Sequence, residues 1–185
     1  MPCSTRSNTL WLVVVVSVIA MLAGCDNVYQ IEKTHDHPTA QTFVEATGHE
    51  LNFDLYLPNS FTGWEPAPDN KFTYNPQNQS YELTNFDVSR TPVDNLGERF
   101  KITSENWQHE YGFTYSNSYI EESTVGLLSG EPAVFNLHQY TIQADAKDMF
   151  VEFPANTQPK ALHFKVKIID PRPPVRALLM LSFSE

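Results

Sequence analysis

The sequence predicts an all-β protein with a single antiparallel β-sandwich domain, immunoglobulin-like in the broad sense. Roughly nine or ten short stretches have the alternation or composition of strands, and turn residues separate them about every 8 to 15 positions. The chain is rich in Pro, Asn, Thr, Tyr and Phe, which favour strands joined by turns. No long stretch has the period of an amphipathic helix. A partly closed barrel is the alternative architecture.

The first convincing strand covers residues 51–57, where apolar and polar residues alternate until Pro58. We expect the apolar face of this strand to point into the core, and its members are Leu51, Phe53, Leu55 and Leu57. Residues 43–46 are a weaker candidate for an earlier strand. Residues 58–70 predict a loop, because the three prolines in this segment suppress regular pairing.

Further strands are expected along the rest of the chain. The shorter ones cover residues 71–74, 80–86, 99–103, 125–128 and 149–153. Residues 133–144 form a longer strand, and residues 145–148 a brief helical turn. Between residues 107 and 115 the aromatic positions share one face, which we expect in the core or in a half-buried sheet; they are Trp107, His109, Tyr111, Phe113 and Tyr115.

The clearest pair of strands covers residues 161–170 and 175–183, separated by a proline-rich turn at 171–174. In the first of them the apolar residues Leu162, Phe164, Val166 and Ile168 alternate with His163, Lys165 and Lys167. Residues 178–181 are apolar on both faces. The last strand is therefore expected to be central, or covered on both sides.

The N-terminal part of the chain has the plan of a secretory signal. Residues 10–23 are an uncharged apolar run, preceded by a short polar segment that carries Arg6. A membrane-spanning helix needs roughly 20 apolar residues, and this run stops short at Cys25, so a permanent transmembrane helix is the weaker interpretation.

The four residues Leu22-Ala23-Gly24-Cys25 resemble the lipobox of bacterial lipoproteins. The resemblance implies cleavage directly before Cys25 and attachment of a diacylglycerol to its sulfur, usually with a third acyl chain on the amine. Ala23 and Gly24 supply the small side chains needed beside the cleaved bond. Two or three acyl chains hold a protein firmly at a membrane, whereas one holds it weakly. The alternative is an ordinary signal peptide whose cysteine is incidental.

Asp26 and Asn27 follow the cysteine. Asp26 resembles the aspartate that, directly after the lipidated cysteine, retains lipoproteins of enterobacteria-like groups in the inner membrane. Asn27 resembles the asparagine found in the stronger versions of that retention signal. The resemblance therefore implies a lipid anchor on the periplasmic side of the inner membrane, with the outer membrane as the alternative.

These features divide the chain into three segments: a signal peptide at 1–24, a lipidated N-terminus and tether at 25–41, and a β-sandwich domain at 42–185. Residues 26–41 are polar and aperiodic, and about fifteen flexible residues reach roughly 20 Å. The 161 residues that remain after cleavage are enough to bury one core.

Charge and cysteine content exclude several functions. The net charge of the full chain is −10. The only charged residue in the cleaved segment is Arg6, so the mature chain has a net charge of −11. A chain with this charge is repelled by phosphate backbones. Nucleic acid is therefore not an expected partner. Cys3 leaves with the signal and Cys25 is consumed by lipid, so neither a disulfide nor thiol catalysis is expected.

No motif of a catalytic or metal site stands out. Glu32, His35, Asp36 and His37 are the most metal-like cluster, but no third anchor follows at a recognised spacing, so a solvated tether is favoured over a weak metal site. The chain has no Gly-x-Ser-x-Gly elbow, no His-Glu-x-x-His helix and no phosphate loop. We therefore expect that the protein is not an enzyme and that it binds no metal and no cofactor. A hydrolase and a metal-binding protein are the less favoured interpretations.

Trp64 is the candidate ligand contact, because it lies in the proline-rich loop where a binding residue is exposed. Its ring has the chemistry to stack on a sugar. The favoured function is a membrane-anchored periplasmic lipoprotein, a non-catalytic binding or assembly protein of the cell envelope. It would contact membrane lipid through acylated Cys25 and an envelope protein through its domain. The alternative is a carbohydrate- or peptidoglycan-binding module.

Overall fold

The computed structural model describes residues 38–89, 97–113, 123–126, 132–140, 148–153 and 159–184. All of them belong to one unit, His37–Glu185. The predicted signal peptide, the lipobox, the sorting residues Asp26 and Asn27 and the Glu32–His37 cluster lie outside the described residues, as does the predicted helical turn apart from Asp148.

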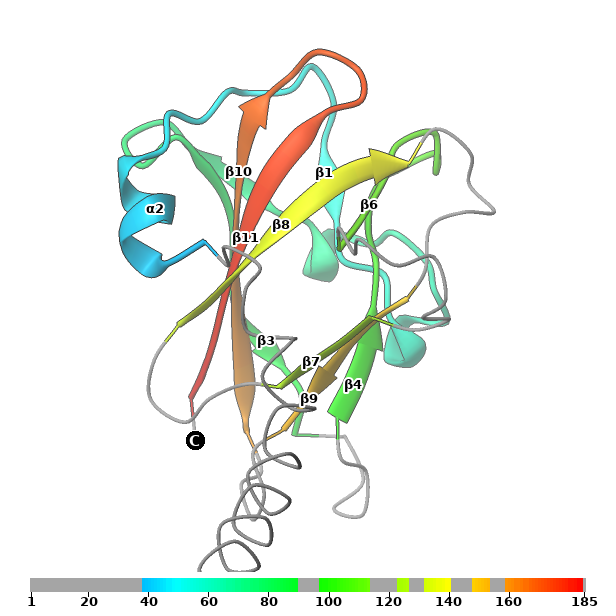
Figure 1. The fold of residues 1–185 in the computed structure, drawn as a ribbon. Coiled ribbons are helices and arrows are strands. Elements are labelled where there is room, and N and C mark those ends of the chain that lie inside the picture. Colours follow the sequence, from blue (N-terminus) through cyan, green and yellow to red (C-terminus); the bar gives the residue numbers. More distant parts are fainter. Residues whose placement is uncertain are drawn as a thin grey trace, which may run out of the picture. The chain divides into compact units, whose positions relative to one another are not determined.

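The described part of the chain is built mainly of strands, which confirms the predicted all-β class (Figure 1). Their bounds are β1 Leu55–Tyr56, β2 Thr73–Asn75, β3 Ser80–Asp87, β4 Gly97–Phe100, β5 Ile102–Ser104, β6 Glu110–Phe113, β7 Ser123–Gly126, β8 Ala133–Tyr140, β9 Met149–Glu152, β10 Ala161–Asp170 and β11 Arg176–Ser184. Short helical segments are α2 Ala40–Glu45, η2 Ser60–Thr62 and η3 Pro68–Asn70.

Within the described residues, eight strands form one antiparallel sheet in the order β1-β5-β6-β8-β11-β10-β3-β2. A second sheet has the order β4-β9-β7, with β4 antiparallel and β7 parallel to β9. Phe100 of β4 packs edge-on against Phe164 of β10, with ring centroids 5.0 Å apart. This contact joins the small sheet to the core of the large one.

The two ends of the large sheet meet through backbone hydrogen bonds. The N–H of Leu57 donates to the carbonyl of Asn70 at 2.8 Å, and the N–H of Phe72 donates to the carbonyl of Leu55 at 2.9 Å. Asn70 and Phe72 lie just before β2, so the chain after the loop returns beside β1. The sheet is thus a nearly closed barrel. This corresponds to the alternative, a partly closed barrel, more closely than to the predicted sandwich.

The barrel interior is packed with apolar side chains. The predicted inward face of β10 is confirmed, since Leu162, Phe164, Val166 and Ile168 are all buried. Tyr111 of β6 is buried among them, which confirms the predicted face of residues 107–115 at this position. Tyr115 and the side chain of Phe113 lie outside the described residues. Trp107 and His109, by contrast, lie half-buried in the turn before β6, because the strand begins only at Glu110.

Strand β11 is apolar on both faces, and both faces are covered by other parts of the protein. Ala177, Leu179 and Leu181 belong to the main core, while Leu178 packs with Phe43 and Val134 in a second cluster. Phe43 belongs to α2, which covers the outer face of the sheet beside β8 and β11 (Figure 1). The predicted central, two-sided position of this strand is confirmed.

The prediction of a strand at residues 43–46 is wrong, because these residues end helix α2. Thr39 caps the helix: its hydroxyl accepts from the N–H of Thr42, and the Thr42 hydroxyl accepts from the N–H of Thr39. This reciprocal capping satisfies two backbone donors and starts the helix in spite of its β-branched residues.

Other predicted strands occur with shifted ends. The 51–57 strand is paired only at Leu55–Tyr56, although Leu55 and Leu57 are buried and Leu51 and Phe53 pack against the core. The 99–103 strand is divided at Lys101 into β4 and β5. Strands β2, β3, β7, β8, β9 and β11 overlap the predicted ranges 71–74, 80–86, 125–128, 133–144, 149–153 and 175–183, and β10 coincides with 161–170.

Candidate functional site

Trp64, the predicted ligand contact, is half-buried and directly follows η2 and Gly63. Its backbone has a φ of 66°, in the left-handed region that side chains other than glycine seldom adopt. The Trp64 N–H donates to the carbonyl of Asn59 at 3.0 Å, which holds the turn closed. The neighbouring Phe61 is 38% exposed. The loop therefore presents two partly exposed aromatic rings.

Buried polar groups hold this loop in place. The side chain of Asn59 is fully buried: its Oδ1 accepts from the N–H groups of Phe61 and Thr62, and its Nδ2 donates to the carbonyl of Leu57. The hydroxyl of Ser60 donates to the buried carboxylate of Glu98. These bonds satisfy the polar groups of the loop from inside the protein.

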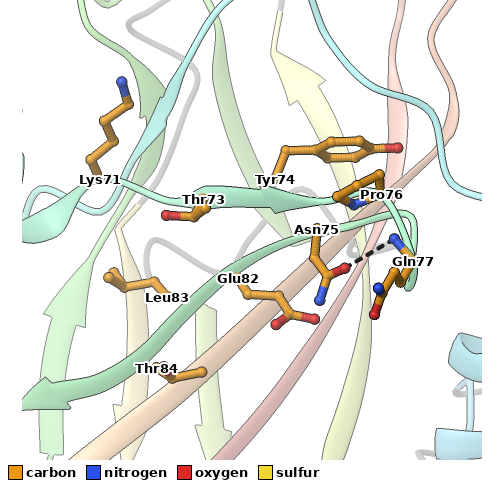
Figure 2. Close-up of a pocket in the computed structure, with 9 residues that line it drawn as sticks. All are labelled: Lys71, Thr73, Tyr74, Asn75, Pro76, Gln77, Glu82, Leu83 and Thr84. Atoms are coloured by element: carbon orange, nitrogen blue, oxygen red, sulfur yellow. Dashed lines mark hydrogen bonds between the residues drawn. The ribbon is translucent and has the colours of Figure 1, made fainter.

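A second candidate lies on the β2–β3 hairpin, where a depression of about 570 Å³ opens at the surface (Figure 2). Its lining residues come from both strands, from the turn between them and from the segment just before β2. They are Lys71, Thr73, Tyr74, Asn75, Pro76, Gln77, Glu82, Leu83 and Thr84. The depression is open to solvent, so it is a surface groove and not an enclosed pocket.

The register of the strands brings this depression together. Thr73 is the cross-strand partner of Glu82, and Glu82 is in turn the partner of Lys165 on β10. Their side chains share the outer face of the barrel, because successive residues of a strand alternate between faces. Tyr81, beside Glu82, is buried in the core. The depression is thus outside the packed interior.

A β-bulge follows the depression along β3. The pairing of β3 with β10 shifts register between Phe164↔Leu83 and Leu162↔Phe86. The extra residue, Asn85, has a φ of 59°, and its N–H donates to Nδ1 of His163 at 3.1 Å. A bulge places an extra side chain on one face of a sheet and bends the strand. Leu83 and Phe86 consequently both pack against the core, while Thr84 remains exposed at the depression.

Charged groups at the depression are paired locally. The Glu82 carboxylate accepts from Asn78 Nδ2 and from the Ser80 hydroxyl, each at 3.0 Å, and lies 3.8 Å from Lys165 Nζ. Burial alone would raise the pKa of Glu82, but these hydrogen bonds and the Lys165 charge outweigh burial, so its pKa lies below the ordinary value. Glu82 is therefore a carboxylate at neutral pH, and its charge is compensated by Lys165 and by the two hydrogen bonds.

Lys71, at the other end of the depression, has its own partner. Its Nζ lies 2.7 Å from Asp54 Oδ2, and this hydrogen bond raises the pKa of Lys71 above its ordinary value. Both side chains are largely exposed, so the pair contributes little to stability. It nevertheless cancels the charge of Lys71 where the depression begins.

The remaining polar groups of the depression are uncharged. Within the described residues, the side chains of Thr73, Gln77 and Thr84 and the hydroxyl of Tyr74 make no hydrogen bond to protein. The Tyr74 ring is half-buried and tilts against Tyr81, with centroids 5.0 Å apart. Tyr74 is the cross-strand partner of the buried Tyr81 and packs against the core, so its ring lies on the inner face. The outer face, where the depression lies, offers hydroxyl, amide and carboxylate groups (Figure 2).

Sequence reasoning placed strands at 71–74 and 80–86 but missed the depression between them. The available signal was the polar turn Asn75-Pro76-Gln77-Asn78, flanked by polar residues at alternate positions. That pattern also fits an ordinary solvent-exposed hairpin. The register of β2 with β3, which defines the site, leaves no separate mark in the sequence.

Among the described residues, no three His, Cys, Asp or Glu side chains come together as metal ligands would. In the same part of the chain, no helix has the length and hydrophobicity required to cross a bilayer. No protein-family model matches the sequence, and no significant similarity was found to a curated protein or to a solved structure.

Proposed function

We propose that this chain is a lipid-anchored protein of the bacterial cell envelope, held on the periplasmic side, that acts by binding rather than by catalysis. The lipobox Leu22-Ala23-Gly24-Cys25 is the observation that carries the proposal. Asp26 and Asn27 favour the inner membrane, with the outer membrane as the alternative. Acylation of Cys25 would hold the chain at the membrane without spanning it.

The use of the buried and half-buried charged groups supports the non-catalytic part of the proposal. Lys167 donates to two backbone carbonyls, and Glu98 accepts from Ser60 and from the N–H of Arg99. Lys101 lies 3.3 Å from Glu110 and 3.8 Å from Asp148. An acid or base catalyst must be able to exchange its proton with a substrate. These groups are instead engaged in holding segments of the fold together.

The favoured partner is another protein of the envelope, which an anchored domain contacts through its loops or through an open strand edge. A carbohydrate- or peptidoglycan-binding module is the second candidate. The half-buried ring of Trp64 beside the exposed Phe61 favours this candidate, because aromatic rings on a rigid loop stack on sugars. If Trp64 is the contact, Trp64→Ala abolishes binding to purified peptidoglycan without loss of the fold.

The anchor is tested with the full chain and two variants, Cys25→Ala and Cys3→Ala. Cells are labelled with a palmitate analogue, membranes are fractionated, and the intact mass of the product is determined. We expect acyl mass on a chain that begins at Cys25, in the wild type and in Cys3→Ala, and no maturation of Cys25→Ala. An unacylated product cut at another bond would overturn the proposal. The membrane fraction that contains the protein decides between inner and outer membrane.

A further inference from the structure

We propose that residues 58–69 form the surface through which this protein binds its partner, and that the partner is a protein with an apolar pocket bordered by Lys or Arg side chains. The inference rests on the proposed binding function, and it names the binding surface and the chemistry of the partner. We call residues 58–69 the seam loop, because they connect the two segments whose hydrogen bonds close the barrel.

The seam loop is much longer than the connection requires. Its two ends are joined where the N–H of Leu57 donates to the carbonyl of Asn70 at 2.8 Å. Antiparallel segments paired in this way are commonly connected by about 2 to 5 residues, whereas the seam loop has twelve. Compact surface loops whose ends are adjacent frequently carry function. The additional residues are therefore explained by what they present to a partner.

Two buried asparagines hold the loop rigid. The side chain of Asn70 is fully buried: its Oδ1 accepts from the N–H of Ala67 at 2.8 Å, and its Nδ2 donates to the carbonyl of Glu65 at 2.9 Å. Asn59 fixes the first half of the loop in the same way, and the hydroxyl of Thr62 donates to the carbonyl of Asn59 at 3.1 Å. A surface that is ordered before binding loses less conformational entropy when the partner arrives.

The exposed part of the seam loop is mainly apolar. Phe61 is 38% exposed, Pro68 is exposed, and Trp64 and Pro66 are half-buried. The hydroxyl and amide side chains of the loop, by contrast, form hydrogen bonds within the loop or to β4. A sugar site needs hydrogen-bonding groups beside an aromatic ring, and here those groups already have partners. An apolar pocket in another protein needs no such groups.

Trp64 occupies a position at which glycine would be less strained. Its φ is 66°, and it directly follows Gly63, whose φ is 61°. Residues held in such strained conformations cluster at functional sites. Tryptophan is also enriched among the residues that contribute most to the affinity of protein interfaces. We therefore expect the Trp64 ring to anchor the contact, together with the exposed ring of Phe61.

The seam loop carries negative charge that has no compensating cation among the described residues. Glu65 and Asp69 are exposed, and neither forms an ion pair there. Glu82 on β3, by contrast, is paired with Lys165. Two uncompensated carboxylates beside aromatic rings favour a partner with Lys or Arg at the border of its pocket. They also argue against contact with anionic lipid headgroups.

The contact is tested by photo-crosslinking in cells of the bacterium that produces the protein. p-Benzoylphenylalanine replaces Phe61 in the full chain, and in a control chain it replaces Val44, which is 66% exposed on α2. We expect position 61 to crosslink to a protein that position 44 does not reach. The product should be sensitive to proteinase K and resistant to lysozyme. Mass spectrometry should locate the crosslink in an apolar segment with Lys or Arg close to it.

The protein identified in this way is purified, and its affinity for the full-length acylated chain in nanodiscs is measured. Trp64→Gly removes the ring and leaves a residue that readily adopts a φ of 66°, so it should keep the fold and weaken binding about tenfold or more. Phe61→Ser should also weaken binding. The double variant Glu65→Gln, Asp69→Asn should slow association and reduce its dependence on salt. Val44→Ser should leave the affinity unchanged.

Circular dichroism in the near ultraviolet shows that each variant is folded. The inference is overturned if position 61 gives no crosslink, or crosslinks only to lipid or to lysozyme-sensitive glycan. It is also overturned if Trp64→Gly and Phe61→Ser keep the wild-type affinity, or if the double variant keeps the wild-type salt dependence. Acyl mass on Cys25 without a crosslink would refute the contact and keep the anchor. A crosslink to protein from an unacylated chain would do the reverse.

Discussion

The Nζ atom of Lys167 lies 2.9 Å from the carbonyl oxygen of Ala46, the residue that ends helix α2. The same ammonium donates to the carbonyl of Val44 at 3.1 Å and lies 5.2 Å from the centre of the Phe43 ring. The last carbonyls of a helix have no partner within the helix. Lys167 supplies one from strand β10, and burial lowers the pKa of its ammonium.

Replacing this lysine should loosen α2. Lys167→Met removes two hydrogen bonds to carbonyls, and we expect a loss of about 1 to 3 kcal/mol in the free energy of unfolding. Lys165→Met is the matched control, because Lys165 has a partly exposed pair with Glu82 and should cost less than about 1 kcal/mol. Urea denaturation followed by far-ultraviolet circular dichroism measures both. Equal losses in the two variants would contradict a special role for Lys167.

Gly48 lies against the turn between β2 and β3. A Cβ atom at this position would be 1.8 Å from the carbonyl oxygen of Gln79, so the two backbone segments must separate to admit it. We expect Gly48→Ala to destabilise the fold by about 1 to 3 kcal/mol or more. Thermal unfolding gives the value. Gly63→Ala is the control: no atom lies within 4 Å of the added Cβ, and only its φ of 61° opposes alanine, at about 1 to 2 kcal/mol.

Hydrogen exchange tests the closure of the barrel. The amides of Leu57 and Phe72 donate across the two ends of the large sheet, so both should exchange as slowly as amides inside the sheet. The amide of Asn78 donates only to a side chain in an exposed turn and should exchange much faster. NMR of the protein transferred to deuterated water measures all three. Rapid exchange at Leu57 and Phe72, with the rest of the sheet protected, would mean that the barrel is open here.

We expect His138 to make the stability depend on pH. Burial lowers the pKa of its ring below the ordinary value of 6.5, and the charge of Arg176 lowers it further. As pH falls through 6.5, the unfolded chain therefore takes up a proton before the folded one does. The free energy of unfolding should decrease across this window, and His138→Gln should reduce that decrease. Arg176→Gln should give an intermediate slope. Denaturant titrations between pH 7.5 and pH 5 would contradict this account if all three slopes agree.

Local patterns were sufficient to predict β10 and β11. Leu162, Phe164, Val166 and Ile168 alternate without a break, and a short proline-rich turn joins the two strands, so no distant information is needed. The failure at residues 43–46 is also local. The pattern of apolar residues suggested a strand, but the capping by Thr39 and Thr42, which lies before the apolar residues, decides for a helix.

Barrel closure and the candidate site depend on contacts between distant segments. The hydrogen bonds between residues 55–57 and 70–72 join two segments separated by a loop with three prolines. The sequence of that loop does not predict that the two segments pair. The depression needs the register of β2 with β3. Trp64 was singled out by its place in a proline-rich loop, and its left-handed backbone became visible only in the structure.

The position of β11 determines the order in which the wall of the barrel can be completed. Its neighbours β8 and β10 both precede it in the chain, and the seam between β1 and the segment before β2 joins the other strands into one continuous arc. Until β11 arrives, that arc ends in the bare edges of β8 and β10. Unpaired edges invite pairing with other chains. In a chain that folds while it is released from its N-terminus, both edges would therefore stay unpaired until β11 became free to pair with them.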